Sequence, residues 1–79
     1  MIIKIGKAID NDFVINHPHV SRYHAKLTYN EDGWLLEDLN STNGTFLNEK
    51  EIETGKAVRL KEGDEIRIAK RRLIIEGIG

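Results

Sequence analysis

The chain has 79 residues, a formal net charge of −1, one proline and no cysteine. This length fits one small domain, residues 1–79, whose core leaves a stability margin of only about 3–5 kcal/mol. Without cysteine there is no disulfide or thiolate metal site, and the composition is typical of a reducing compartment such as the cytoplasm. No apolar run reaches the length of a membrane span, and the balanced charge disfavours nucleic-acid binding. We therefore expect a soluble cytoplasmic domain with no membrane or nucleic-acid partner.

Short alternating apolar segments run through nearly the whole chain. In residues 24–29, for example, Ala25, Leu27 and Tyr29 share one face, which is the period of a half-buried strand. No segment keeps a helical period over about 12 residues. Strands are expected at residues 2–5, 12–15, 24–29, 34–39, 44–48, 57–60, 65–68 and 71–76, with turns at 30–33, 48–51, 61–64 and 69–70. Strands this short and regular predict an all-β sandwich or barrel.

Three polar loops, at residues 6–12, 16–23 and 40–44, are expected to gather at one end of this fold, where binding groups are most often carried. The segment Asn-Ser-Thr-Asn-Gly-Thr at 40–45 holds more hydroxyls and amides than a turn requires. Turn chemistry accounts for Ser41 and Gly44. Thr42 and Asn43, at the tip, are interpreted as groups that bind an anionic ligand and its backbone.

The stretch 19–25 contains a serine and a histidine three residues apart, Ser21 and His24. A nucleophile and base would also need an orienting acid, an oxyanion hole and a cleft, and nothing in this short chain indicates them. Ser21 is interpreted as a hydroxyl donor to a phosphate. His24 is interpreted as a partly buried, hydrogen-bonded residue that supports the loops. Arg22 fits a solvated charge or an anion contact equally well. We therefore expect a protein that is not an enzyme.

The first loop offers a cation beside a glycine at a strand end, Gly6-Lys7, and we interpret Lys7 as facing an anion. Asp10, Asn11 and Asp12 lack the ligand spacing of a helix-loop-helix calcium site, so side-chain bonds to nearby backbone are expected instead. The histidines at 17, 19 and 24 have no thiolate partner, which disfavours zinc. No metal or cofactor is expected.

Four motifs occur in order: "IGK-x3-ND-x-VI", "VSRYHA", "EDLNSTNGTFLN" and "L-x2-GDEIRI". Together they resemble a forkhead-associated (FHA) domain over residues 3–75. The resemblance implies a small β-sandwich of two mainly antiparallel sheets, of the SMAD/FHA-like class, with its binding loops at one end. It also implies a module that binds phosphothreonine peptides and so mediates phosphorylation-dependent protein–protein interaction in Ser/Thr kinase signalling.

The resemblance also implies roles for individual residues. Ser21 and Thr42 would contact the phosphate, with Arg22 at its edge and Asn43 on the peptide main chain. His19 would select the residue after the phosphothreonine. Four residues would support the site, namely Gly6, His24, Ser41 and Gly44.

Two departures from the family pattern stand out. Lys7 replaces the usual arginine and offers a point charge rather than a rigid fork of donors, so weaker or less selective binding is expected. Only Met1 and Ile2 precede the strand at Ile3, where the family usually has two more strands, so this is expected to be a short form with an open strand edge. The alternative function is therefore a degenerate adaptor that binds unphosphorylated surfaces or forms a homodimer.

Overall fold

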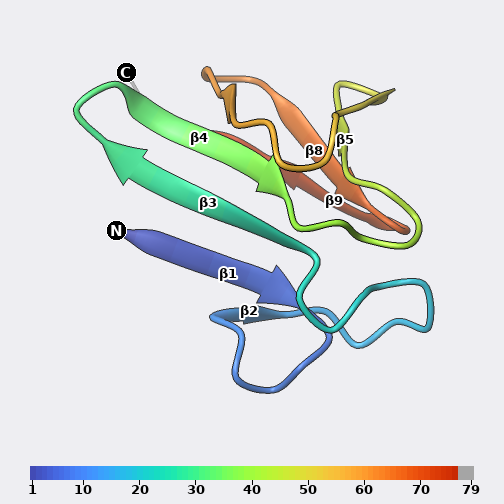
Figure 1. Cartoon of the computed structure of the whole chain (residues 1–79). Helices are drawn as coiled ribbons and strands as arrows, with labels where there is room; N and C mark the ends of the chain where they lie inside the picture. The colour runs from blue at the N-terminus through green and yellow to red at the C-terminus, as the bar shows by residue number, and fades with distance from the viewer. Residues whose placement is uncertain (77–79) are drawn as a thin grey trace.

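The computed structural model describes residues 1–76, which form two β-sheets packed face to face (Figure 1). The expected all-β sandwich is confirmed. The first sheet has the spatial order β2-β1-β3-β4-β7, with β1 at Ile2–Gly6, β2 at Phe13–Val14, β3 at Ala25–Asn30, β4 at Gly33–Asp38 and β7 at Val58–Arg59. The second has the order β6-β5-β8-β9, with β5 at Phe46–Leu47, β6 at Lys50–Glu51, β8 at Glu65–Ile68 and β9 at Arg71–Ile74. No helix in this part of the chain is long and apolar enough to cross a membrane.

The hairpins of the sandwich follow from local sequence. β3 and β4 pair antiparallel with Asn30 opposite Gly33, as the turn composition predicts. β8 and β9 pair with Ile68 opposite Arg71, so Ala69 and Lys70 alone form the turn, also as expected. Ala69 adopts a φ of 55°, the positive value that such tight hairpin turns require.

Several sequence-based expectations were wrong in detail. The strands expected at 44–48, 57–60 and 71–76 contain only Phe46–Leu47, Val58–Arg59 and Arg71–Ile74. The strand at 12–15 contains only Phe13 and Val14, and it runs parallel to β1. Asp12 is outside it because its carboxylate accepts a hydrogen bond from the backbone N–H of Lys4 at 2.8 Å. The turn at 48–51 contains only Asn48 and Glu49, both with positive φ, and the next two residues form β6. A tight turn therefore leaves room for one more short strand.

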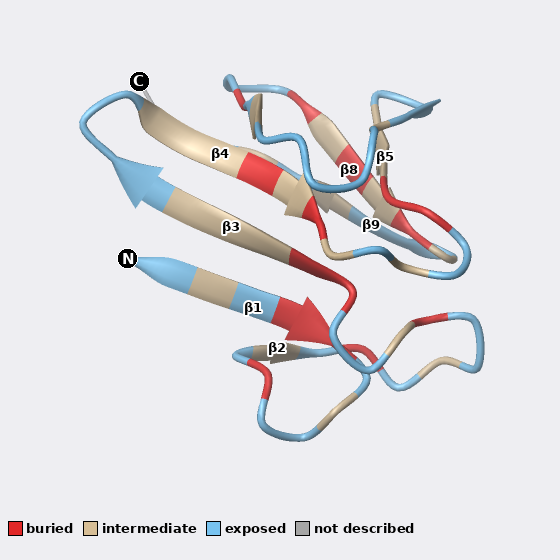
Figure 2. Cartoon of the chain, in the orientation of Figure 1, coloured by how far each residue is buried: buried red, intermediate tan, exposed pale blue. Residues whose placement is uncertain are grey.

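The core has an apolar part and a polar part. The buried apolar side chains are Ile5, Ile15, Val20, Ala25, Leu36, Leu60, Ile66 and Ile68. Four of the buried polar residues lie in or next to the loops: Asp38 ends β4, His24 and Thr45 directly precede β3 and β5, and Asn11 lies between β1 and β2. Figure 2 shows buried positions at the ends of β1 and β4 and at the start of β3. Buried polar groups must be hydrogen-bonded to be tolerated. They therefore form a structured layer beneath the loops.

Substitution of Gly6 tests how closely the first two loops approach. A Cβ at Gly6 would overlap the backbone carbonyl of Arg22, which cannot move aside as a side-chain tip can. We expect Gly6→Ala to lower the free energy of unfolding by about 3 kcal/mol. The control is Gly55→Ala, where a methyl meets open space and only the positive φ costs roughly 1–2 kcal/mol. Equal losses in urea denaturation would contradict the close approach.

Candidate functional site

Three loops meet at one end of the sandwich, and we call the surface formed by residues 7–12, 16–23 and 40–44 the loop end (Figure 1). Backbone hydrogen bonds join the first loop to the second. The N–H of Lys7 donates to the carbonyl of Ser21 at 3.0 Å, and the N–H of Ala8 donates to the carbonyl of Arg22 at 3.1 Å. The expected gathering of the first two loops is therefore confirmed by hydrogen bonds between their backbones.

Asn11 strengthens this junction. Its side-chain amide donates to the carbonyl of Ala8 at 2.8 Å and to that of Arg22 at 2.7 Å, and the residue is 8% exposed. The sequence predicted backbone bonds within its own loop but did not indicate the bond to Arg22. Its side-chain oxygen is buried and has no partner among the described residues. Asn11 thus fixes the backbone on both sides of the junction.

His24 connects the second loop to the third. It is fully buried, rather than partly buried as expected. Its Nδ1 accepts a hydrogen bond from the N–H of Ser21 at 3.1 Å, and its Nε2 is 2.9 Å from the carbonyl oxygen of Gly44. Only the neutral ring with its proton on Nε2 satisfies both contacts, because a carbonyl oxygen cannot donate. Both ring nitrogens are occupied, which leaves neither free to act as a base.

Asp38, at the end of β4, organises the third loop. It is 4% exposed, and its carboxylate accepts hydrogen bonds from the hydroxyls of Ser41 and Thr45 and from the N–H of Ser41. Ser41 in turn accepts a bond from the N–H of Gly44 at 3.1 Å. Burial alone would raise the pKa of Asp38, but the hydrogen bonds led by Ser41 and Thr45 outweigh it and lower that pKa. No signal in the sequence indicated this role, because Asp38 looked like an ordinary strand end.

Two side chains at the exposed tips complete the contact between the second and third loops. The N–H of Thr42 donates to the hydroxyl oxygen of Ser21 at 3.1 Å. The side-chain amide of Asn43 donates to the carbonyl of His19 at 2.9 Å. Ser21 and Asn43 therefore have structural contacts that the sequence did not predict for them.

Several hydrogen-bond donors remain available at the loop end. Within residues 1–76, no ion pair involves Lys7 or Arg22, and both are exposed. The hydroxyl proton of Ser21 is free, because the observed bond to Thr42 uses only its oxygen as an acceptor. The hydroxyl of Thr42 is exposed too. This set of cations and hydroxyls suits an anion.

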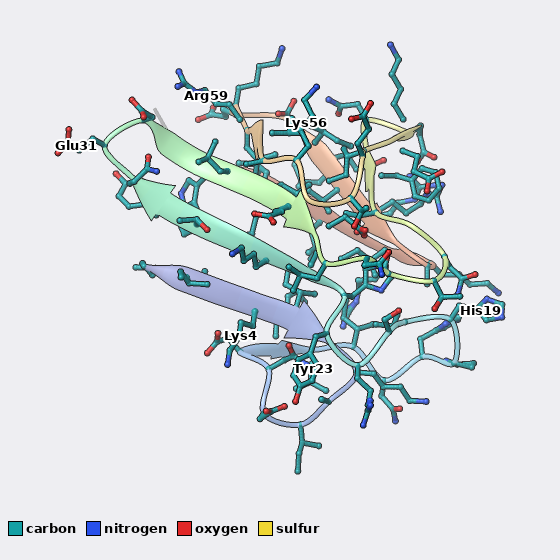
Figure 3. All side chains as sticks on the ribbon, viewed as in Figure 1. Lys4, His19, Tyr23, Glu31, Lys56 and Arg59 are labelled. Atoms are coloured by element: carbon teal, nitrogen blue, oxygen red, sulfur yellow. The ribbon has the colours of Figure 1, made fainter. Side chains whose placement is uncertain are left out.

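The edge of the loop end is marked by His19 and Tyr23, which Figure 3 shows on the side away from Glu31 in the β3–β4 turn. The Tyr23 hydroxyl donates to the Asp10 carboxylate, with oxygen–oxygen distances of 2.9 and 3.1 Å, and this bond raises the pKa of Tyr23. His19 is exposed, with its ring edge-on to that of His17 at 5.3 Å. The carboxylate of Asp10 is therefore already engaged.

The family model for the FHA domain matches residues 3–69. The chain belongs to the FHA domain family. This match confirms the resemblance carried by the four motifs. FhaB of Mycobacterium tuberculosis, an FHA domain-containing protein, is 40% identical over 68 residues, which cover 86% of this chain and 43% of FhaB. The chain thus spans less than half the length of this relative.

Solved structures give the same result. EmbR of Mycobacterium tuberculosis, in complex with a low-affinity phosphopeptide, superposes with a TM-score of 0.89 at 33% identity, over 95% of this chain and 19% of that chain. The N-terminal FHA domain of Saccharomyces cerevisiae Rad53, in complex with a phosphothreonine peptide, gives 0.81 at 34% identity, over 87% and 56%. This FHA chain is a non-catalytic binding module and a homologue of phosphothreonine-binding domains.

The role of Asp38 predicts an acid-dependent stability. Because its folded-state pKa lies below the unfolded value, its contribution is present above about pH 4 and is lost as the pH falls through the folded pKa. Asp38→Asn should lower the free energy of unfolding at neutral pH by about 1–3 kcal/mol. It should also flatten the loss of stability below that pH. Urea titrations of both proteins across acidic pH check this, and parallel pH profiles would contradict it.

The bridging role of Asn11 predicts a specific weakness. Asn11→Asp places a carboxylate oxygen against the carbonyls of Ala8 and Arg22 in place of the donor. We expect a loss of about 2–3 kcal/mol in the free energy of unfolding, with amide chemical-shift changes centred on Lys7 and Arg22. Asn16→Asp, at an exposed position, is the matched control. Shift changes that avoid the junction would show that Asn11 does not hold it.

Proposed function

We propose that the loop end of this FHA domain binds phosphothreonine peptides. One observation carries the proposal. The bond from the N–H of Thr42 to the oxygen of Ser21 brings two hydroxyl-bearing residues from different loops together, with the free cations Lys7 and Arg22 on the same end of the described chain. A phosphothreonine brings about −1.5 to −2 charges and three strong acceptor oxygens. The donors at the loop end complement that group.

The phosphate contacts follow from which protons are free. Ser21 donates its hydroxyl proton while its oxygen stays bonded to Thr42, so binding does not break the bridge between the loops. Thr42 donates a second hydroxyl. Lys7 stands where we expect the family arginine and supplies a compact charge on a flexible stem, while Arg22 supplies a fork of donors at the edge. The lysine favours a weaker and less directional hold on the phosphate.

The peptide chain is held by the neighbouring groups. The nitrogen of the Asn43 amide is used by His19, so its oxygen is the atom available to accept from a peptide N–H. His19 is exposed beside that contact, and we propose that its ring selects the residue after the phosphothreonine. Gly6, His24, Ser41 and Gly44 hold these groups in place without contacting the ligand.

The partners are then phosphothreonine-containing proteins or peptides made by a Ser/Thr kinase, and we propose the cytoplasm as the compartment. Self-association is a second candidate, and one observation favours it. The last strand of the second sheet, β9, has an unpaired edge within residues 1–76. A strict monomer by light scattering at high concentration would contradict this second function.

Fluorescence anisotropy tests the main proposal. The domain is titrated against one degenerate peptide library made with phosphothreonine, phosphoserine or plain threonine. We expect selective binding of the phosphothreonine version. Ser21→Ala should weaken it about tenfold or more, the cost of losing one hydrogen bond to a charged group. Lys7→Gln should weaken it, and Lys7→Arg should strengthen it.

The control is Lys56→Gln, which removes the same charge from a lysine that Figure 3 shows apart from His19 and Tyr23. It should leave the affinity unchanged. Binding that does not depend on phosphate in either the native protein or Lys7→Arg would contradict the proposed function. That result would favour a degenerate adaptor for unphosphorylated surfaces.

A further inference from the structure

The longest free strand edge in the described part of the chain belongs to β9. The other edge strands, β2, β6 and β7, have two residues each, whereas β9 has four. Antiparallel pairs alternate between hydrogen-bonded and non-bonded positions. Arg71 closes the tight turn opposite Ile68, so Arg71 and Leu73 use their backbone groups toward β8. The N–H and C=O groups of Arg72 and Ile74 therefore point outward from the sheet.

Apolar side chains lie beside this edge. Ile74, on β9 itself, is 53% exposed. A groove of about 220 Å³ also opens between the two sheets here, lined by Ile3, Leu27, Trp34, Leu60, Ile74, Ile75 and Glu76. A free edge with exposed apolar residues is a surface that native proteins pair or cover. An occupant for this edge is therefore expected.

We infer that two copies of this chain pair through β9 in an antiparallel arrangement centred on Leu73. The inference rests on the second candidate function and adds to it the strand and the register. With Leu73 on the two-fold axis, the outward groups of Arg72 face those of Ile74 in the other copy, and both sets are paired. Two four-stranded sheets then join into one.

The charges around the edge select this register. With Leu73 opposite itself, Lys70 of one copy lies opposite Glu76 of the other, and the reverse pair forms as well. Opposite charges at facing positions stabilise a strand pair, whereas like charges destabilise it. Within one copy, Lys70 lies in the turn directly before β9 and Glu76 lies two residues after its end, so the whole strand separates them and they are too far apart to pair with each other. The complementarity is therefore between copies.

The two arginines of β9 do not oppose this pairing. Nη1 of Arg72 is 2.6 Å from a carboxylate oxygen of Glu49 and 2.6 Å from one of Glu65, so its charge is offset within its own chain. The guanidinium of Arg71 lies over the Phe13 ring, 5.4 Å from the ring centre. In the proposed register Arg71 faces Ile75 and Arg72 faces Ile74, so no arginine faces another.

This interface is small, because it consists of one short strand from each copy and the apolar side chains beside it. Interfaces of this size give weak, reversible association. We therefore expect a dimer that forms in the micromolar to millimolar range rather than a permanent one. Lys70 and Glu76 lie outside the phosphate-binding set, so the dimer is separable from peptide binding.

Sedimentation velocity over this concentration range tests the register through charge reversal. Lys70→Glu and Glu76→Lys should each weaken the dimer about tenfold, because two attractive pairs become two repulsive ones. An equimolar mixture of the two variants should regain the native association. In the mixed dimer, the Lys70→Glu copy carries a carboxylate at both positions and the Glu76→Lys copy carries an ammonium at both. Both facing pairs are therefore opposite in charge again.

A second variant tests the apolar edge. Ile74→Lys should dissociate the dimer, and Val14→Lys, a matched change on the β2 edge that is 39% exposed, should not. A native protein that stays monomeric throughout would overturn both self-association and its register. A native dimer whose affinity does not change with charge reversal at either position would overturn only the register. Neither result bears on phosphopeptide binding, which anisotropy reads separately.

Discussion

The loop end depends on the two hydrogen bonds of one buried imidazole. Nδ1 of His24 accepts a hydrogen bond from the N–H of Ser21, and Nε2 donates one to the carbonyl oxygen of Gly44. A single ring therefore fixes the distance between two loops. A ring with no exposure cannot exchange these partners for water without cost. Any loss of this contact would therefore affect the position of Ser21 and the turn at Gly44 together.

The other buried polar residues extend this arrangement. Asp38 fixes the third loop through Ser41 and Thr45, and Asn11 fixes the first loop to the second through Ala8 and Arg22. The loops are thus held in place by side chains that lie beneath them. A site that is ordered before binding loses less conformational entropy when the ligand arrives. A small domain can in this way bind a flexible peptide without a deep cleft.

Local pattern predicted the parts of this fold that depend on local chemistry. The β3–β4 and β8–β9 hairpins follow from alternation and turn residues, and the motifs located the three loops. The parallel pairing of β2 with β1 could not be predicted, because it depends on a non-local contact between two very short segments. The role of Asp38 in the third loop and the hydrogen bond from Asn11 to Arg22 were missed for the same reason. Both depend on contacts in space that the neighbouring residues in the sequence do not indicate.

The fold depends less on the side chain of Lys7 than on the side chains of the other residues of the proposed site. Ser21 and Asn43 each hold a neighbouring loop, so their side chains serve the fold as well as the proposed ligand. Lys7 joins the second loop through its backbone N–H, and that bond is the same for any residue except proline. Its exposed side chain is therefore free to vary in sequence without disturbing the loops. A change from arginine to lysine at this position would therefore alter the proposed hold on a phosphate and leave the scaffold intact.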